Sequence, residues 1–356
     1  MALLPDCSDL TMRRLALLNT SMMRMFLTIA TLLAASPAAA QTSISATQFD
    51  SFVASDPAFG DIAWHIDNVN AEAKGPLVVW LPGSGAYPHF QNFSDGSLGR
   101  SFPPELLAYR DRAHFMLIDK PGIPFVAEMQ FDEENGRPLP LDNPIYRAGL
   151  ARDTLISRTV LAISAARVAL GDKIDRVVVI GGSEGAQYVF AVAGLAHADK
   201  AVGWGGLALP QYYDFILDQR LRAERGEISR AEAQAAIEDI FADIQAIQAD
   251  PLSLERRFIG ETNRRWSGFG SHAVVDDMLA LDIPLLLVQG GDDPKAPIIN
   301  TDFAMVAFLS RGRTNLDYWV YPDADHGFRS ADPDNPGKKI SIAGAIWSRV
   351  WDWVMA

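Results

Sequence analysis

The chain of 356 residues holds one cysteine, Cys7, which lies in a segment with the features of a secretory signal. We therefore expect a mature chain without any thiol. This lack excludes a cysteine nucleophile, thiolate metal sites and disulfides, and no other metal site is expected. Chemistry that depends on a nucleophile must use another side chain.

Basic residues are also scarce, with 31 Lys and Arg against 44 Asp and Glu and a formal net charge of −13. A surface of this sign repels nucleic-acid phosphates and anionic lipids, so neither nucleic acid nor a membrane surface is an expected partner. Hydrophobic residues make up 49% of the chain. That content can bury one large core or two moderate ones, which argues against disorder.

Long hydrophobic runs are missing too. The apolar run at residues 25–35 follows Arg24 and is about half as long as a membrane helix, which needs ~20 residues. Ala38 and Ala40 then occupy the small-residue positions of a signal-peptidase site. We expect residues 1–40 to be removed as a signal peptide, no later segment to span a membrane, and the mature chain to be periplasmic or secreted.

Two alternatives for this segment stay open. Arg13 and Arg14 loosely match a twin-arginine export signal. Met22 and Met23 suggest a later translation start, which would make residues 1–21 an over-called reading frame. Sequencing the N-terminus of an uncleaved precursor distinguishes a late start from an early one.

From Trp64 onward, short β-branched runs alternate with longer helical stretches, which is typical of an α/β fold with a mostly parallel sheet covered on both faces. The predicted strands cover residues 76–81, 115–119, 176–180, 201–204, 283–289 and 316–321. The predicted helices cover residues 146–170, 184–196, 301–310 and 340–354.

Residues 211–265 interrupt this alternation, because they carry no strand signal and are rich in Ala, Glu, Arg and Gln. The apolar positions that share one helical face are Ile237, Ile240, Phe241, Ile244 and Ile247. Ser229 and Glu232 form a capping box before them. Ligands bind at the carboxyl edge of open α/β sheets. We therefore expect a helical cap over that edge, between core segments 41–210 and 266–356, although such a face usually indicates only that a helix packs on something.

The run at residues 177–180 leads directly into Gly-Gly-Ser-Glu-Gly, residues 181–185. A serine on a sharp strand-to-helix turn exposes its hydroxyl at the sheet edge, and the flanking glycines avoid collisions there. Ser183 is therefore the candidate nucleophile, the alternative being an idle serine in a glycine-rich turn. The backbone N–H of Glu184 is a candidate oxyanion donor, and its side chain is expected to be a first-turn acid favoured by the helix dipole.

A serine hydroxyl needs an imidazole to take its proton. His326 lies in a loop just beyond the predicted strand 316–321, in Asp-His-Gly-Phe. It is the candidate base. His89, close to a glycine-rich loop, is the alternative.

The imidazole in turn needs a carboxylate to orient it. Asp293 follows the predicted strand 283–289 and is favoured over its neighbour Asp292. Asp323 and Asp325 are close to the base in sequence, but we expect them to form turns.

Acyl transfer needs two preorganised donors for the oxyanion. Besides Glu184, the glycine-rich loop at residues 82–88 offers the backbone N–H of Ser84, with that of Gly85 as the next choice. Four aromatic residues are candidate walls of an apolar substrate pocket: Tyr87, Phe90, Trp266 and Phe269. The alternative, and the more common role for any one such residue, is packing in the core.

The order Pro-Gly-Ser-Gly, Gly-Gly-Ser-Glu-Gly, Gly-Gly-Asp-Asp-Pro and Asp-His-Gly-Phe resembles the α/β-hydrolase superfamily, whose triads run Ser, Asp or Glu, then His. The resemblance covers about residues 60–356, and Leu-Ile-Asp-Lys-Pro-Gly at 117–122 looks like the turn after the family's fourth strand. It implies an eight-stranded sheet, a cap inserted after the sixth strand and no cofactor. Leu-Pro and Gln-Gly replace the His-Gly that many members carry before the oxyanion loop and before the acid, which leaves the subfamily open.

Three functions are consistent with these residues. The first is a hydrolase that cleaves a small carboxylic ester through an acyl-enzyme. The second keeps the same triad but cleaves a short peptide, and the third is a binding protein without turnover.

Overall fold

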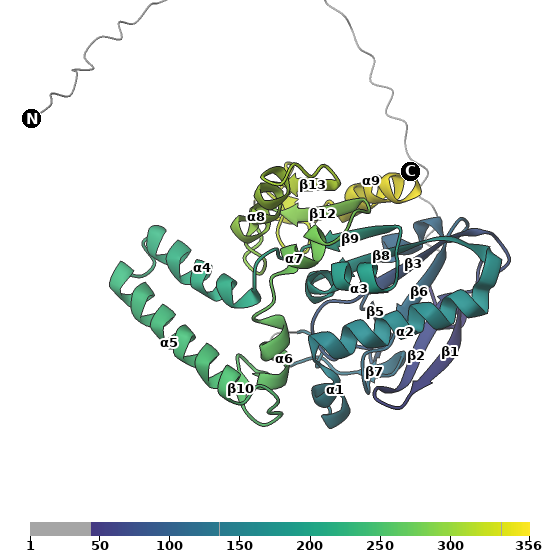
Figure 1. The fold of residues 1–356 in the computed structure, drawn as a ribbon, viewed down its shortest axis with the longest axis horizontal. Helices are drawn as coiled ribbons and strands as arrows, with labels where there is room; N and C mark the ends of the chain where they lie inside the picture. The colour runs from purple at the N-terminus through teal and green to yellow at the C-terminus, as the bar shows by residue number, and fades with distance from the viewer. Residues whose placement is uncertain (1–43, 135, 336) are drawn as a thin grey trace, which may run out of the picture. The chain divides into compact units, whose positions relative to one another are not determined.

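The computed structural model describes residues 44–134, 136–335 and 337–356, so the predicted signal segment lies outside the described residues. Eight strands form the main sheet in the order β1-β2-β6-β3-β8-β9-β12-β13 (Figure 1). They are β1 (Phe49–Asp56), β2 (Gly60–Asp67), β3 (Gly75–Leu81), β6 (His114–Ile118), β8 (Ile174–Gly182), β9 (Lys200–Trp204), β12 (Leu285–Gly290) and β13 (Leu316–Tyr321). Every pairing from β6 to β13 is parallel, and β2 pairs antiparallel with both its neighbours. The predicted eight-stranded, mostly parallel sheet is therefore confirmed.

The central strands read as continuous apolar runs because both of their faces are covered. All residues of β3 and of β12 are buried. The edge strand β1 is different, since its residues are mostly exposed or half-buried. The sequence pattern missed β1 for this reason, and it also missed β2, although most residues of β2 are buried.

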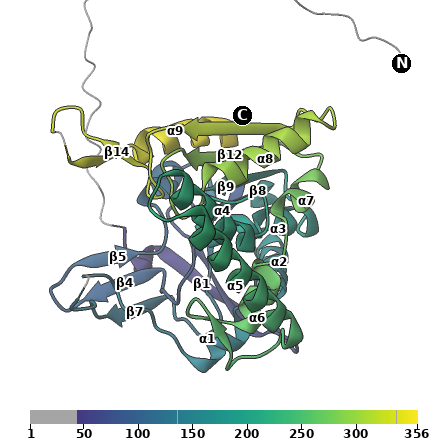
Figure 2. The same ribbon diagram turned by 90° about the vertical axis from the view of Figure 1, so that its left-hand side faces the viewer.

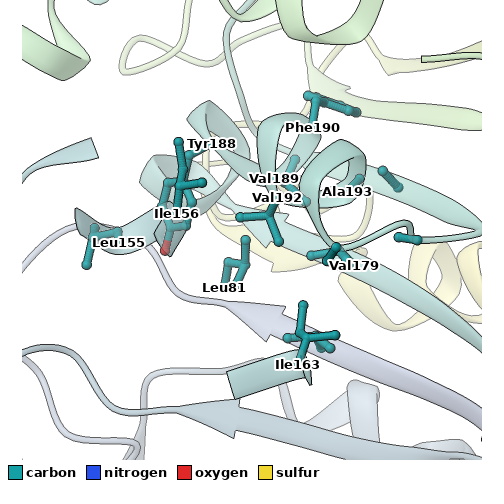
Figure 3. Packing of buried hydrophobic residues seen from close by; sticks show 14 of the residues in the cluster. Leu81, Leu155, Ile156, Ile163, Val179, Tyr188, Val189, Phe190, Val192 and Ala193 are labelled. Atoms are coloured by element: carbon teal, nitrogen blue, oxygen red, sulfur yellow. The ribbon is translucent and has the colours of Figure 1, made fainter. Parts of the chain in front are cut away.

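Alternation along the strands divides the core into two layers. In β3, Val79 faces a cluster that includes Leu155 and Ile163 of α2 (Arg152–Leu170). Figure 3 shows these α2 side chains with those of α3 (Val189–Leu195) around Leu81 and Val179. The alternate strand residues face a second cluster, which includes Trp347 and Trp351 of α9 (Ala343–Met355). Full burial of each large apolar side chain contributes about 2 kcal/mol, so the two layers fix the sheet between its helices.

Helix α2 corrects one expectation. By length and composition, residues 152–173 are long and apolar enough to cross a membrane, although no such segment was expected after the signal. Leu155, Ile163 and Ala166 of this helix are buried in the core against the strands. Packing on the sheet accounts for these apolar residues.

The insert 211–265 follows β9, the sixth strand of the main sheet in chain order. It contains α4 (Gln211–Glu224) and α5 (Arg230–Ala249), which Figure 1 shows as a helical hairpin extending away from the sheet. The capping box is confirmed, since Ser229 Oγ accepts from the Glu232 N–H at 3.1 Å and the Glu232 carboxylate accepts in return.

The predicted apolar face of α5 is only partly buried. Ile247 packs with Tyr212 and Trp266 at the base of the hairpin, and Ile237 is also buried. Phe241 is 46% exposed, so the packing expected for this face does not extend to Phe241. Phe241 lies at the edge of this helical face, where a side chain points partly toward solvent.

The remaining elements surround this core. Strands β5 (Leu98–Arg100), β4 (Phe90–Phe93) and β7 (Val126–Met129) form a separate three-stranded sheet (Figure 2). Two small hairpins pair β10 (Arg257–Phe258) with β11 (Glu261–Thr262), and β14 (Arg329–Ala331) with β15 (Lys339–Ser341). The other helices are α1 (Pro144–Gly149), α6 (Asn263–Phe269), α7 (Val274–Leu279) and α8 (Ile298–Leu309), with 3-10 turns η1 (Ala46–Gln48), η2 (Pro104–Tyr109), η3 (Gly171–Lys173) and η4 (Ser183–Gln187).

Candidate active site

The loops after five parallel strands lie along one edge of the sheet, because parallel strands have their carboxyl ends on the same side. Ser183 follows β8, Asp293 follows β12 and His326 follows β13. The loop that starts at Pro82 follows β3, and Lys120 follows β6. The topology therefore brings these distant chain segments to one site.

Ser183 lies on a strained turn between β8 and η4, with a φ of 53°. The turn is tight because backbone approaches backbone: a Cβ on Gly185 would come within 2.1 Å of the Leu81 carbonyl oxygen, and one on Gly181 within 2.3 Å of the Gly185 oxygen. Only glycine fits at these two positions. The structure replaces the start of the predicted helix 184–196 with the 3-10 turn η4, which precedes the short helix α3.

The imidazole of His326 lies between Ser183 and Asp293. Its Nε2 is 3.1 Å from Ser183 Oγ, and its Nδ1 is 2.7 Å from Asp293 Oδ2. The His326 side chain is 25% exposed whereas that of Asp293 is fully buried. An imidazole held by a buried carboxylate on one nitrogen can accept the serine proton on the other.

Asp293 is held by several donors besides His326. Its Oδ1 accepts from the backbone N–H groups of Lys295 (2.8 Å) and Ala296 (3.1 Å). Gln289 Nε2 donates to the Ala296 carbonyl at 2.6 Å and lies 3.4 Å from Asp293 Oδ2. Gln289, which stands at one of the departures from the family pattern, thus supports the loop that carries the acid.

The three other candidate acids point elsewhere. Asp292 is exposed and pairs with Lys339 at 3.3 Å. Asp325 accepts from the backbone N–H of Gly327 at 3.0 Å, as a turn former does, and Asp323 is exposed.

His89 is occupied away from the site. Its Nε2 donates to the Ile118 carbonyl at 3.0 Å, and its Nδ1 is 3.1 Å from Ser101 Oγ. Burial lowers the pKa of His89, and the charge of Asp119 opposes part of this shift. The structure therefore separates His89 from Ser183 and brings His326 to it.

The glycine-rich loop after β3 reaches the serine at Gly83. A Cβ placed on Gly83 would lie 3.8 Å from Ser183 Oγ, so the following amide, that of Ser84, lies close to the reacting region. Among the described residues, the Ser84 N–H donates to no protein acceptor. Gly85 has a φ of 95° and packs against the Tyr87 ring.

A cavity of about 310 Å³ lies beside this loop. Gly83, Ser84, Tyr87 and Arg100 are among the residues that line it. Of the four predicted pocket aromatics, Tyr87 is the one found in its wall.

The structure places the other three aromatics in buried clusters. Phe90 is 6% exposed and packs edge-on against Phe102 and Phe125. Trp266 (3% exposed) and Phe269 (1% exposed) lie beneath the guanidinium of Arg265. These three side chains pack in the core, which was the alternative role, and their candidate role as walls of a pocket was wrong.

Glu184 also differs from expectation. It lies in the first turn of η4, as expected, but its side chain is 2% exposed and accepts from Arg265 Nη2 at 2.9 Å, which was not expected. Lys120 and Arg265, which were not predicted as site residues, surround this carboxylate. The only sequence signal was a lysine inside the turn motif 117–122, and Arg265 gave none because it lies within the insert.

Comparisons with known proteins identify the fold. No family model matches the chain, and no curated protein matches it in sequence. Among solved structures, the esterase Pf2001 from Pyrococcus furiosus superposes with a TM-score of 0.50 at 12% identity, over 86% of this chain and 91% of that one. The α/β hydrolase GrgF from Penicillium sp. sh18 gives a TM-score of 0.50 at 12% identity, over 86% and 97%.

A larger protein gives the same fold match. Dipeptidyl peptidase 4 from Porphyromonas gingivalis superposes with a TM-score of 0.50 at 13% identity, over 86% of this chain. The match covers 35% of the peptidase, so this chain spans about a third of its length. The chain has the α/β-hydrolase fold, and the resemblance drawn from its motifs is confirmed at the level of fold.

Proposed function

We propose that this protein is a serine hydrolase that cleaves small carboxylic esters through an acyl-enzyme intermediate. The observation that carries the proposal is the single imidazole that contacts both the Ser183 hydroxyl and the Asp293 carboxylate. Ser183 is only half-buried, which also supports the proposal, because a substrate must reach the hydroxyl.

The geometry supports a two-step reaction. Ser183 Oγ attacks the ester carbonyl carbon while His326 Nε2 takes its proton, and the Ser84 and Glu184 N–H groups bind the resulting oxyanion. Collapse of the tetrahedral intermediate breaks the ester C–O bond, and His326 returns the proton to the departing alkoxide. Water then attacks the acyl-enzyme by the same route, which releases the acid and restores the serine.

The space beside the oxyanion loop favours a small acyl group. At about 310 Å³ the cavity is at the lower end of the volumes typical of ligand pockets, which favours a small acyl group over a long one. In this proposal the Tyr87 ring forms its apolar wall, and the hairpin of α4 and α5 acts as the cap that borders the site.

Labelling with a fluorophosphonate probe tests the nucleophile. The probe phosphonylates an activated serine, so the wild type should be labelled and Ser183→Ala should not. Ser164→Ala is the matched control, since the Ser164 hydroxyl is exposed on α2 and bonds only its own helix. An unlabelled wild type would favour a binding protein that keeps the fold without turnover.

Peptide cleavage is the second candidate, and the fold match to a dipeptidyl peptidase favours it. An ester and an amide with the same acyl group, for example p-nitrophenyl butyrate and butyryl p-nitroanilide, separate the two functions. The ester hypothesis expects the ester to be cleaved and the anilide to show no cleavage above that of Ser183→Ala. Cleavage of the anilide that depends on Ser183 would favour a peptidase or amidase.

We also propose export of the mature chain to the periplasm or medium, on the basis of the signal features in residues 1–40. N-terminal sequencing of the exported protein should begin at Gln41. A cytosolic protein that retains this segment would contradict the proposal.

A further inference from the structure

Three ionic side chains are buried together next to the candidate oxyanion hole. Lys120 is 5% exposed, Glu184 2% and Arg265 4%. Lys120 Nζ lies 3.7 Å from the Glu184 carboxylate, whose other oxygen accepts from Arg265. Burial lowers the pKa of Lys120, and the charge of the Glu184 carboxylate opposes part of this shift.

The ammonium of Lys120 binds the oxyanion loop directly. It donates to the carbonyl of Gly83 at 2.5 Å and to the carbonyl of Gly85 at 2.9 Å. A trans peptide is planar, with its C=O and N–H pointing in opposite directions. Fixing the Gly83 carbonyl toward Lys120 therefore points the Ser84 N–H away from Lys120, and that N–H has no protein acceptor among the described residues.

The same cluster holds the second donor. Glu184 is the residue after the nucleophile, and its N–H is the other candidate oxyanion donor. Its side chain is fixed by Arg265 through two hydrogen bonds of 2.9 and 3.3 Å. One buried group of charges therefore touches both arms of the oxyanion hole.

Stability does not explain this arrangement. Removing three charges from water costs several kcal/mol for each ion, and apolar residues of the same size would often stabilise a fold equally well. A glycine-containing loop is flexible by itself. An ammonium that binds two of its carbonyls restricts its backbone conformation before the substrate binds.

We propose that Lys120 is a positioning residue that preorganises both arms of the oxyanion hole, with Glu184 as its counterion and Arg265 as the support of that carboxylate. The inference rests on the proposed hydrolase function. In this proposal Lys120 acts through the Gly83–Ser84 peptide, to whose carbonyl it donates, although it also lines the cavity beside the loop. Its loss should therefore weaken binding of the transition state more than binding of the substrate.

The main test is Lys120→Met assayed with p-nitrophenyl butyrate and with a short alkyl trifluoromethyl ketone, which forms an oxyanion when the serine adds to it. We expect kcat to fall about 100-fold while KM changes less than about threefold. The inhibition constant of the ketone should rise by about the factor by which kcat/KM falls. A folded variant with kcat within threefold of wild type overturns the proposal.

Lys200→Met is the matched control. Lys200 Nζ also donates to a backbone carbonyl, that of Trp353 at 2.7 Å, but it lies at the start of β9, away from the carboxyl edge of the sheet. We expect this variant to keep its kcat and its affinity for the ketone. A matching loss of kcat in both variants would indicate a general structural effect and would overturn the positioning role.

Glu184→Gln keeps the test decisive if Lys120→Met does not fold. It preserves side-chain shape and the Ser183–Glu184 peptide but removes the countercharge, so kcat should fall about tenfold at unchanged KM. In the double variant the losses should be non-additive, because both act through one cluster. An unchanged kcat in Glu184→Gln contradicts the proposal, whereas a wild type without probe labelling contradicts the hydrolase function itself.

Discussion

The Ser183 hydroxyl lies 3.1 Å from His326 Nε2, although 143 residues separate the two in the chain. Between them the chain forms β9 and β12, which are also the strands that lie between β8 and β13 in the sheet. Parallel pairing of these strands aligns their carboxyl ends. The contact is thus a consequence of strand order, and its chemistry can be tested at each partner.

Replacing Asp293 with Asn should lower kcat about 10⁴-fold at nearly unchanged KM. The Asn amide can donate to His326 Nδ1, which stabilises the tautomer that carries its proton on Nε2 and cannot accept one from Ser183. Steady-state kinetics on an ester measure this effect. Asp292→Asn is the control, because Asp292 is exposed and pairs with Lys339, and equal losses in both variants would contradict the role of Asp293.

Ser183→Gly should be more stable than Ser183→Ala by about 1 kcal/mol, although both should be inactive. The φ of 53° at this position is strained for any residue with a Cβ and is free of strain for glycine. Denaturant unfolding of the two variants gives the difference. If Ser183→Ala proves equally stable, the turn does not store strain.

Gly185→Ala should reduce the free energy of unfolding by about 2 kcal/mol or more. Its Cβ would lie 2.1 Å from the Leu81 carbonyl oxygen, and backbone cannot move aside without disturbing β3. Gly344→Ala in α9 is the control, since a Cβ there meets nothing within 4 Å, and alanine is the better helix former. A well-folded Gly185→Ala variant with wild-type stability would contradict the predicted clash.

Asp214→Asn should change how stability depends on pH. Asp214 of α4 is buried and accepts from Asn300 Nδ2 at 2.6 Å. Burial raises its pKa to about 7, and the charge of Asp293 acts in the same direction. Between about pH 4 and pH 7 the folded chain keeps this proton and the unfolded chain does not, so the free energy of unfolding falls as the pH rises through that window.

The Asn variant lacks this proton equilibrium, and its amide oxygen can still accept from Asn300. Its Tm relative to wild type should therefore rise from pH 5 to pH 8. Thermal unfolding across this range measures the difference. A difference in Tm that does not vary with pH would show that Asp214 has the same pKa in the folded and unfolded chain.

The sequence predicted the central strands and the three residues that the structure brings together, for a physical reason. The buried parallel strand β3 is apolar throughout, and β12 is apolar up to Gln289. Glycine is required at positions 181 and 185 because backbone segments approach each other closely there. These constraints are local, so they are visible in short stretches of sequence.

Features set by tertiary contacts were not visible. Edge strand β1 has too little apolar pattern to mark it. Trp266 and Phe269 are aromatic in any setting, and only packing decides that they lie under Arg265 and not in an open pocket. The ion cluster joins Lys120, Glu184 and Arg265 from three distant segments. No motif or regular spacing in the sequence indicates that such residues pair.

The base of the helical hairpin holds a further consequence. The Tyr212 N–H donates to the Gly270 carbonyl at 3.0 Å and its hydroxyl donates to the Trp266 carbonyl at 2.9 Å, so the chain enters and leaves the hairpin at one place. A segment closed in this way can be lengthened, trimmed or exchanged while the strands on either side keep their positions. The outer turn between α4 and α5 can therefore change in length or sequence without moving Arg265, which lies at the base of the hairpin and contacts Glu184.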